Sequence, residues 1–75
     1  MNLKEAVAVA KQRVAELCAP EIPQNMRLEN FLYDDHLAVW SLTIGFALPG
    51  MVEARSLKLV RVSETHKNVL SVEDR

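Results

Sequence analysis

The residues of this chain that could do nucleophilic chemistry are few and widely spaced. A nucleophile, a base and an acid can be combined only across separate segments, as Cys18, His36 and Asp34. No nucleophile elbow or oxyanion-binding loop accompanies them. We also expect Cys18 to lie near the end of a helix, where the helix dipole raises the pKa of a thiol and lowers its reactivity. The sequence therefore predicts no catalysis by this set.

Metal-ligating and paired acidic residues occur only in segments that we expect to be solvated. His36 and His66 lie in different turns, and neither belongs to a closely spaced pair that would bring two ligands together. The pairs Asp34-Asp35 and Glu73-Asp74 are expected to be exposed, and exposed carboxylates are poorly suited to separate acid and base roles. We expect no metal, no cofactor and no enzymatic activity.

The charge pattern gives little reason to expect a nucleic acid or a membrane as partner. The formal net charge is -1, from 9 Lys and Arg and 10 Asp and Glu residues. Arg55, Lys58 and Arg61 alternate between the faces of a predicted strand, so they form no single basic surface. No apolar stretch approaches the roughly 20 residues of a membrane span. The first residues do not resemble an export signal, and the single Cys18 fits a reducing compartment, so we expect a cytoplasmic protein.

The elements that position these residues begin with an amphipathic helix. Asn2 and Glu5 have the spacing of a capping box, and Pro20 ends the helix. The segment Pro20–Asn25 is expected to be a loop. Val9 falls on the polar side of the helix. The apolar stripe recurs at helical spacing and consists of Leu3, Val7, Ala10, Val14 and Leu17.

A strand with one large apolar face organises the rest of the chain. Its residues Trp40, Leu42, Ile44 and Phe46 alternate with small or polar ones. Strands are expected over residues 26–33, 37–47, 55–62 and 69–73, the first as a bulged edge strand because its apolar pattern is irregular. Asn68 is expected to adopt the left-handed conformation, and Leu70 and Val72 to share a face.

Short connections favour antiparallel neighbours. We therefore predict an α+β fold in a single small domain, residues 1–75, with an N-terminal helix packed on one face of a four-stranded antiparallel meander (α-β-β-β-β). Domains of this size often gain stability from a partner subunit.

The closing hairpin resembles that of PepSY-like domains and of small bacterial cystatin-like α+β proteins. It reads Lys58-Leu59-Val60-Arg61-Val62, a polar turn, and then Val69-Leu70-Ser71-Val72-Glu73-Asp74. A helix with the cadence Glu5-Ala6-Val7-Ala8-Val9-Ala10-Lys11 precedes the sheet. Lys67 and Asn68 stand where those families have Gly-Glu. The resemblance implies the fold and a binding or inhibitory role, and it carries over no catalytic residues.

A single helix covers only one face of the sheet, which leaves the other face and the sheet edges for binding. The second strand contributes small residues there, together with either Leu57 and Leu59 or Val60 and Val62 from the third. The loop Leu48–Ala54 is a further candidate, because loops often carry function. The candidate interaction surface consists of Val39, Ser41, Thr43, Pro49, Gly50, Met51, Leu57 and Leu59.

We expect a non-catalytic protein-binding or inhibitor-like module, acting as a homodimer or on an unidentified protein. Two alternatives stay open. One is a small-ligand binder or enzyme that uses a cavity between helix and sheet near Tyr33, Trp40 and His36. The other is an immunity- or antitoxin-like partner that neutralises another protein.

Overall fold

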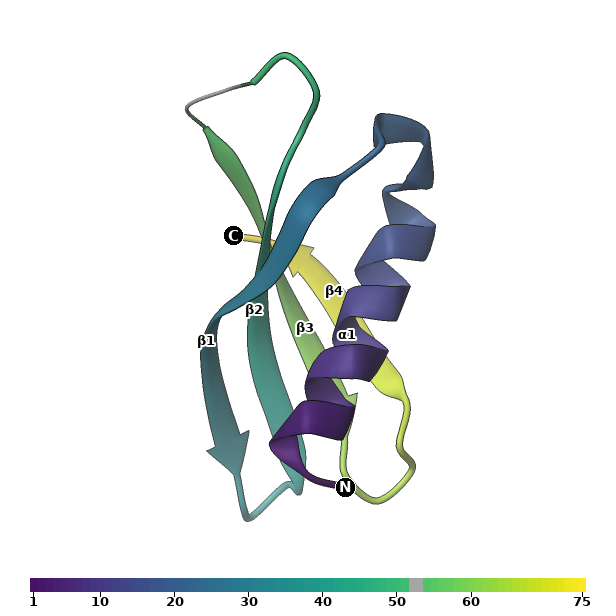
Figure 1. Ribbon diagram of the computed structural model, residues 1–75. Coiled ribbons are helices and arrows are strands. Elements are labelled where there is room, and N and C mark those ends of the chain that lie inside the picture. Colours follow the sequence, from purple (N-terminus) through teal and green to yellow (C-terminus); the bar gives the residue numbers. More distant parts are fainter. Residues whose placement is uncertain (52–53) are drawn as a thin grey trace.

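The computed structural model, which describes residues 1–51 and 54–75, has an N-terminal helix beside a four-stranded sheet (Figure 1). The strand order is β1-β2-β3-β4, and each pair of neighbours is antiparallel. The predicted α-β-β-β-β meander is therefore confirmed. The elements are α1 (Leu3–Leu17), the short 3-10 helix η1 (Ala19–Glu21), β1 (Gln24–Asp34), β2 (Val39–Ala47), β3 (Arg55–Ser63) and β4 (Val69–Asp74).

The start of α1 is fixed by the predicted capping box. The Glu5 backbone N–H donates to Asn2 Oδ1 at 2.9 Å, and the Asn2 backbone N–H donates to Glu5 Oε1 at 3.0 Å. These bonds satisfy N–H groups that have no partner within the helix. The helix ends at Leu17, and η1 occupies the start of the segment that we expected to be a loop.

The buried stripe of α1 is narrower than predicted and slightly rotated. Ala6, Ala10, Val14 and, just past the helix, Cys18 are buried at a spacing of four residues. Leu17 was expected in this stripe but is 57% exposed, so that prediction is wrong. Val9, expected on the polar side, packs against the core. The two buried alanines have small side chains, which let the helix lie close to the sheet.

The α1 side of the sheet is built from the apolar faces of β2 and β3. Leu42 pairs with Val60 and Trp40 pairs with Val62, and directly paired residues point to the same face. Val60 and Val62 are fully buried beneath α1, together with Leu42, Ile44 and Phe46. This register resolves which residues of β3 meet the helix, and it leaves Leu57 and Leu59 on the opposite, open face.

β1 extends beyond the predicted residues 26–33 at both ends, to Gln24 within the expected loop and to Asp34 before the β1–β2 turn. The Asp34 side-chain Oδ1 accepts hydrogen bonds from the backbone N–H groups of His36 and Leu37, at 3.0 and 3.1 Å. Leu37 therefore lies in the turn and is exposed, and β2 starts at Val39. An aspartate that bonds to the backbone two and three residues later is a typical turn former.

The β3–β4 hairpin differs from the prediction in two details. A register shift in β4 lies opposite Arg61 and Val62, so that Val69 and Val72 pack on the core while Leu70 is exposed. The expected pairing of Leu70 and Val72 on one face is wrong, because the shift changes the alternation. Lys67 rather than Asn68 has a positive φ, of 54°.

Candidate interaction surface

The last five residues of β1 form its regular part. Register shifts occur between Gln24 and Arg27 and between Leu28 and Asn30, which confirms the predicted bulged edge strand. From Asn30 to Asp34 each residue pairs with one residue of β2. The outer side of β1 has no neighbouring strand among the described residues. A regular, unpaired strand edge is a template for pairing with another strand.

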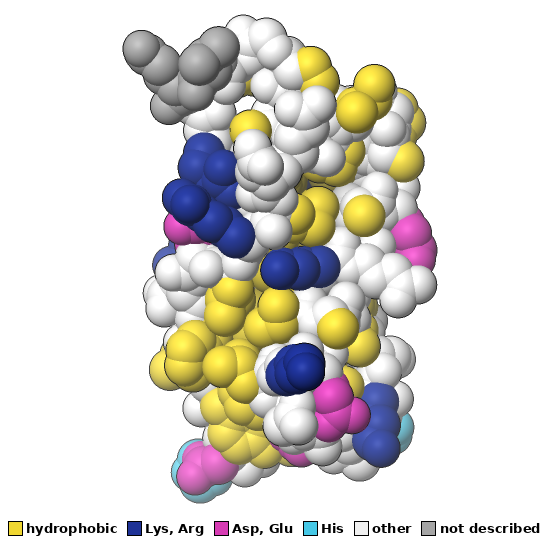
Figure 2. Space-filling model, viewed as in Figure 1, with side chains coloured by type: hydrophobic (Ala, Val, Ile, Leu, Met, Phe, Trp, Pro, Cys, Tyr) yellow, Lys and Arg dark blue, Asp and Glu magenta, His cyan; other side chains and the backbone are white. Residues whose placement is uncertain are grey.

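Three consecutive large apolar side chains of this stretch are exposed. The exposed fractions are 50% for Phe31, 68% for Leu32 and 39% for Tyr33. The pairing with β2 places Phe31 and Tyr33 on the α1 side of the sheet and Leu32 on the open face. Figure 2 shows apolar side chains gathered over the lower part of β1 and along its border with α1. We call Phe31, Leu32 and Tyr33 the β1 edge patch.

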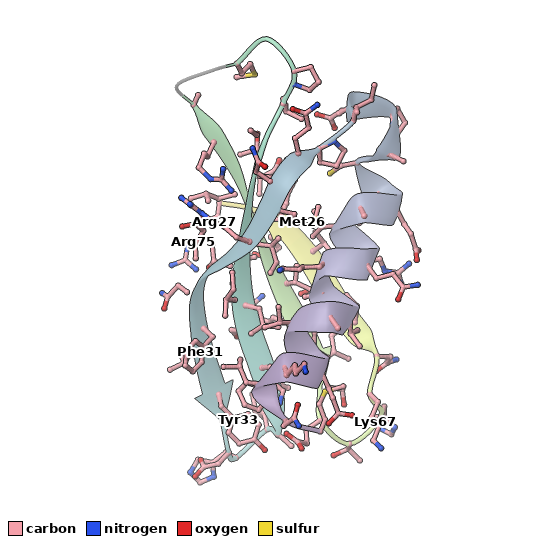
Figure 3. All side chains as sticks on the ribbon, in the orientation of Figure 1. Met26, Arg27, Phe31, Tyr33, Lys67 and Arg75 are labelled. Atoms are coloured by element: carbon pink, nitrogen blue, oxygen red, sulfur yellow. The ribbon has the colours of Figure 1, made fainter. Side chains whose placement is uncertain are left out.

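The backbone of the β1 edge patch has hydrogen-bonding groups that point away from the sheet. The Phe31 N–H donates to the side-chain Oδ1 of Asn30 at 2.8 Å and thus not to β2. In an antiparallel strand, alternate residues turn their N–H and C=O to opposite sides. Leu32 therefore bonds to β2, whereas Phe31 and Tyr33 direct their backbone groups outward. Figure 3 shows Phe31 at the outer border of the sheet and Tyr33 between the end of β1 and the first turn of α1.

Tyr33 is supported by a polar cluster at the N-terminal end of α1. Its ring centroid lies 4.6 Å from that of Trp40, with the rings tilted by 47°. Trp40 Nε1 donates to Glu64 Oε2 at 2.9 Å, and the N-terminal ammonium of Met1 donates to Glu64 Oε1 at 2.9 Å. Desolvation and the nearby Glu64 raise the pKa of the Tyr33 phenol, so it stays neutral at physiological pH.

The open face is partly covered by charged side chains of the chain itself. Glu29, at the register shift of β1, lies over Gly45, where a Cβ atom would be 2.6 Å from Glu29 Oε1. Arg27 Nε donates to the same oxygen at 2.7 Å, and Arg55 Nε lies 3.3 Å from it. The hydrogen bond from Arg27 is the main cause that lowers the pKa of the Glu29 carboxyl. Gly45 is therefore needed for the close approach of Glu29.

The predicted residues of the open face do lie on one surface. Val39, Ser41, Leu57 and Leu59 are half-buried, and the register places them on the same face as buried Thr43. Nη1 of Arg75, the residue after β4, donates to Thr43 Oγ1 at 3.0 Å. The structure thus brings these five residues together. Their apolar surface is less exposed than that of the β1 edge patch.

The predicted loop lies at the other end of the sheet. Met51 N–H donates to the Leu48 carbonyl at 3.1 Å, and Gly50 has φ of 83°, as expected for a Pro-Gly turn. Pro49, Gly50 and Met51 are exposed, and the loop follows the end of β2 that is remote from Asn30–Asp34 (Figure 1). Val52 and Glu53, the next residues of this predicted loop, lie outside the described part of the chain.

The residues considered for catalysis and metal binding lie apart. Cys18 is buried, and this burial raises the pKa of its thiol, while Lys58 partly opposes the shift. His36 and His66 are exposed in separate turns. Within residues 1–51 and 54–75, no three His, Cys, Asp or Glu side chains gather as a metal site would require. The structure therefore does not bring Cys18 together with His36, which lies in the turn at the opposite end of the molecule (Figure 1).

Two shallow surface pockets lie away from Tyr33, Trp40 and His36, where the small-ligand alternative placed its cavity. One, of about 200 Å³, lies beside α1 and β4 and is lined by Val9, Gln12, Arg13, Glu16 and Val69. The other, of about 300 Å³, is lined by Arg55, Ser56, Leu57, Lys58, Asp74 and Arg75. Neither pocket is lined by one of the three residues named for that cavity.

The three residues of the β1 edge patch were not among those predicted for binding, although the sheet edges were. A signal for the patch was present, because Phe31-Leu32-Tyr33 places large apolar side chains on both faces of a predicted edge strand. Their exposure depends on where α1 packs, and α1 buries the middle of the sheet more than β1. The position of α1 on the sheet is decided by tertiary packing, and no local sequence pattern reveals it.

No protein-family model matches the chain, and searches of curated proteins and of solved structures likewise find no match. In the part of the chain that the structure describes, the helices are too short or too polar to cross a membrane.

Proposed function

We propose that this chain is a small non-catalytic protein-binding module that binds an extended segment along the outer edge of β1. One observation carries the proposal: three consecutive apolar side chains, Phe31, Leu32 and Tyr33, are exposed on a regular strand with outward-facing backbone groups. In strand addition, the main chain supplies affinity and alternate side chains supply specificity. The apolar side chains on both faces of β1 fit this mode.

Two further observations support the proposal. The resemblance of the closing hairpin to PepSY-like and cystatin-like domains implies a binding or inhibitory role. The free, buried Cys18 supports a cytoplasmic setting, in which a thiol stays reduced.

A peptide-binding experiment tests the proposal directly. We would select extended peptides from a random library displayed on phage, synthesise the selected peptide and map its binding by backbone amide chemical shifts. We expect shifts along Asn30–Asp34 and loss of binding in Leu32→Lys. Leu70→Lys is the matched control, because Leu70 is also exposed but lies on β4.

Two results would contradict strand addition at β1. The first is a failure to select any peptide with a chain that sedimentation shows to be monomeric, so that its β1 edge is unoccupied. The second is a set of shifts centred on Leu57 and Leu59, which would place binding on the open face instead.

A further inference from the structure

The regular part of β1 is symmetric about Leu32. Asn30 and Phe31 precede Leu32, Tyr33 and Asp34 follow it, and the strand ends at Asp34. The register shift before Asn30 stops regular pairing on the other side. A two-fold axis through Leu32, perpendicular to the sheet, would therefore pair the whole regular stretch with itself.

We propose that the partner of the β1 edge patch is a second copy of this chain, paired antiparallel through a two-fold axis at Leu32. The proposal rests on the proposed function, because it names the occupant of the same strand edge. The two sheets then form one continuous sheet with both α1 helices on the same face. Such an interface is isologous and closes after two copies.

The side chains match across this axis. Phe31 of each copy lies opposite Tyr33 of the other, and the two Leu32 side chains meet on the open face. Aromatic pairs placed directly opposite one another stabilise antiparallel strands. Asn30 lies opposite Asp34 of the second copy, so an amide that can donate faces a carboxylate that accepts, and the two Asp34 carboxylates stay apart.

Neighbouring axes fit less well. An axis at Phe31 would place Tyr33 opposite Glu29, which belongs to the register shift. An axis at Tyr33 would place the charged Asp34 opposite Leu32. Of the three axes, only the one at Leu32 pairs every residue from Asn30 to Asp34 and places no carboxylate opposite an apolar side chain.

The backbone groups also match this axis. Phe31 and Tyr33 direct their N–H and C=O outward, so each Phe31–Tyr33 pair across the interface can exchange two hydrogen bonds. In the single chain, Asn30 Oδ1 accepts a hydrogen bond from the Phe31 N–H. In the dimer, the Tyr33 carbonyl of the second copy would accept that hydrogen bond instead. The side chain of Asn30 thus satisfies this donor in the single chain.

The other edge of the sheet is less suited to self-pairing. β4 has six residues, and the register shift near Leu70 interrupts its pairing with β3. Its last residues, Glu73 and Asp74, are exposed acids. Charges and irregularities at strand edges oppose pairing with another chain.

Sedimentation of the full chain tests whether a dimer forms. We would measure wild type from about 1 μM to 1 mM, a range that covers weak and moderate affinities. We expect a transition from monomer to dimer with rising concentration. A chain that stays monomeric throughout, or one that forms open-ended assemblies, would overturn the proposal.

Amide hydrogen exchange tests where the dimer forms and needs no variant. The N–H groups of Phe31 and Tyr33 should exchange about tenfold more slowly once most chains are dimeric, because the dimer buries them. The Leu32 N–H is bonded to β2 in the single chain, so its exchange should change much less. Protection that appears on β4, or equal changes at Leu32 and its neighbours, would contradict the axis at Leu32.

Variants give a second line of evidence. Leu32→Lys places two ammonium groups beside each other at the axis and should abolish the dimer, whereas Leu70→Lys should leave it unchanged. Circular dichroism would check that both variants fold. A selected peptide that binds at β1 while wild type stays monomeric would remove the homodimer but leave the proposed function standing; loss of both would remove both.

Discussion

The indole of Trp40, on β2, donates a hydrogen bond at 2.9 Å to the carboxylate of Glu64, the first residue after β3. The other oxygen of Glu64 accepts from the N-terminal ammonium of Met1. Trp40 also contacts the ring of Tyr33. This one carboxylate therefore joins the start of the chain, the core strand β2 and the aromatic pair that supports the β1 edge patch.

The stability of the fold should depend on the ionisation of Glu64. The hydrogen bond from the N-terminal ammonium is the main cause that lowers the Glu64 pKa below its ordinary value of 4.5, and Trp40 adds to it. A carboxyl whose pKa is lowered by folding stabilises the folded state above the ordinary pKa. This contribution should disappear as the pH falls from about 4.5 through the lower pKa of the folded state.

Thermal unfolding of wild type and of Glu64→Gln, followed by Trp40 fluorescence, measures this contribution. We expect wild type to be the more stable at pH 7 and the difference to shrink below pH 4.5. Glu16→Gln is the control, because Glu16 is an exposed carboxylate on α1. A difference between wild type and Glu64→Gln that does not change with pH would contradict an ionised Glu64 in this cluster.

Gly45 should be intolerant of a side chain only while Glu29 lies above it. A Cβ atom at Gly45 would lie 2.6 Å from Glu29 Oε1 and 2.8 Å from Glu29 Cγ, and Arg27 and Arg55 hold the carboxylate in place. We expect Gly45→Ala to lower the free energy of unfolding by roughly 1–2 kcal/mol, as overpacking does. Chemical denaturation measures this loss.

The effect of Gly45→Ala on the free energy of unfolding should change sign when the side chain of Glu29 is shortened. In a Glu29→Ala background the Cβ atom meets no carboxylate, and alanine is the better strand residue, so Gly45→Ala should be neutral or stabilising. Four proteins complete the cycle: wild type, the two single variants and the double variant. Equal effects of Gly45→Ala in both backgrounds would show that Glu29 is not the obstacle.

Sequence patterns predicted the parts of this molecule that depend on local chemistry. The capping box of Asn2 and Glu5, the apolar face of β2 and the bulged character of β1 follow from residue type and spacing. The helix stripe was partly misjudged because Leu17 and Cys18 are neighbours, and packing selects Cys18. A hydrophobicity scale cannot distinguish two adjacent apolar residues near a helix end.

The candidate surface depended more on tertiary structure. Alternation placed Thr43 on the open face but left open whether Leu57 and Leu59 or Val60 and Val62 lie beside it, and only the register of β2 and β3 shows that Leu57 and Leu59 do. It could not show that Arg75 bonds to Thr43 or that Glu29 folds over Gly45, because these contacts join residues far apart in the sequence. The β1 edge patch likewise depends on the position of α1.

Leu42 should be among the residues on which folding depends most. It is fully buried between α1 and the sheet and lies opposite Val60. Leu42→Ala should lower the free energy of unfolding by about 2–5 kcal/mol, because it removes apolar contacts and leaves a cavity. Leu70→Ala is the control at an exposed position. Equal losses for the two variants in chemical denaturation would contradict the assignment of the core.

Ile22 should be a position where substitution stabilises the protein. It follows η1 with φ of 56° and ψ of 63°, and it is 63% exposed. The left-handed conformation costs roughly 1–2 kcal/mol for an ordinary residue, and asparagine tolerates it better. Ile22→Asn should therefore raise the free energy of unfolding by up to about 1 kcal/mol. Ile22→Val keeps the branched side chain and should give no gain, so a Val variant as stable as the Asn variant would show that the backbone conformation at this position is not strained.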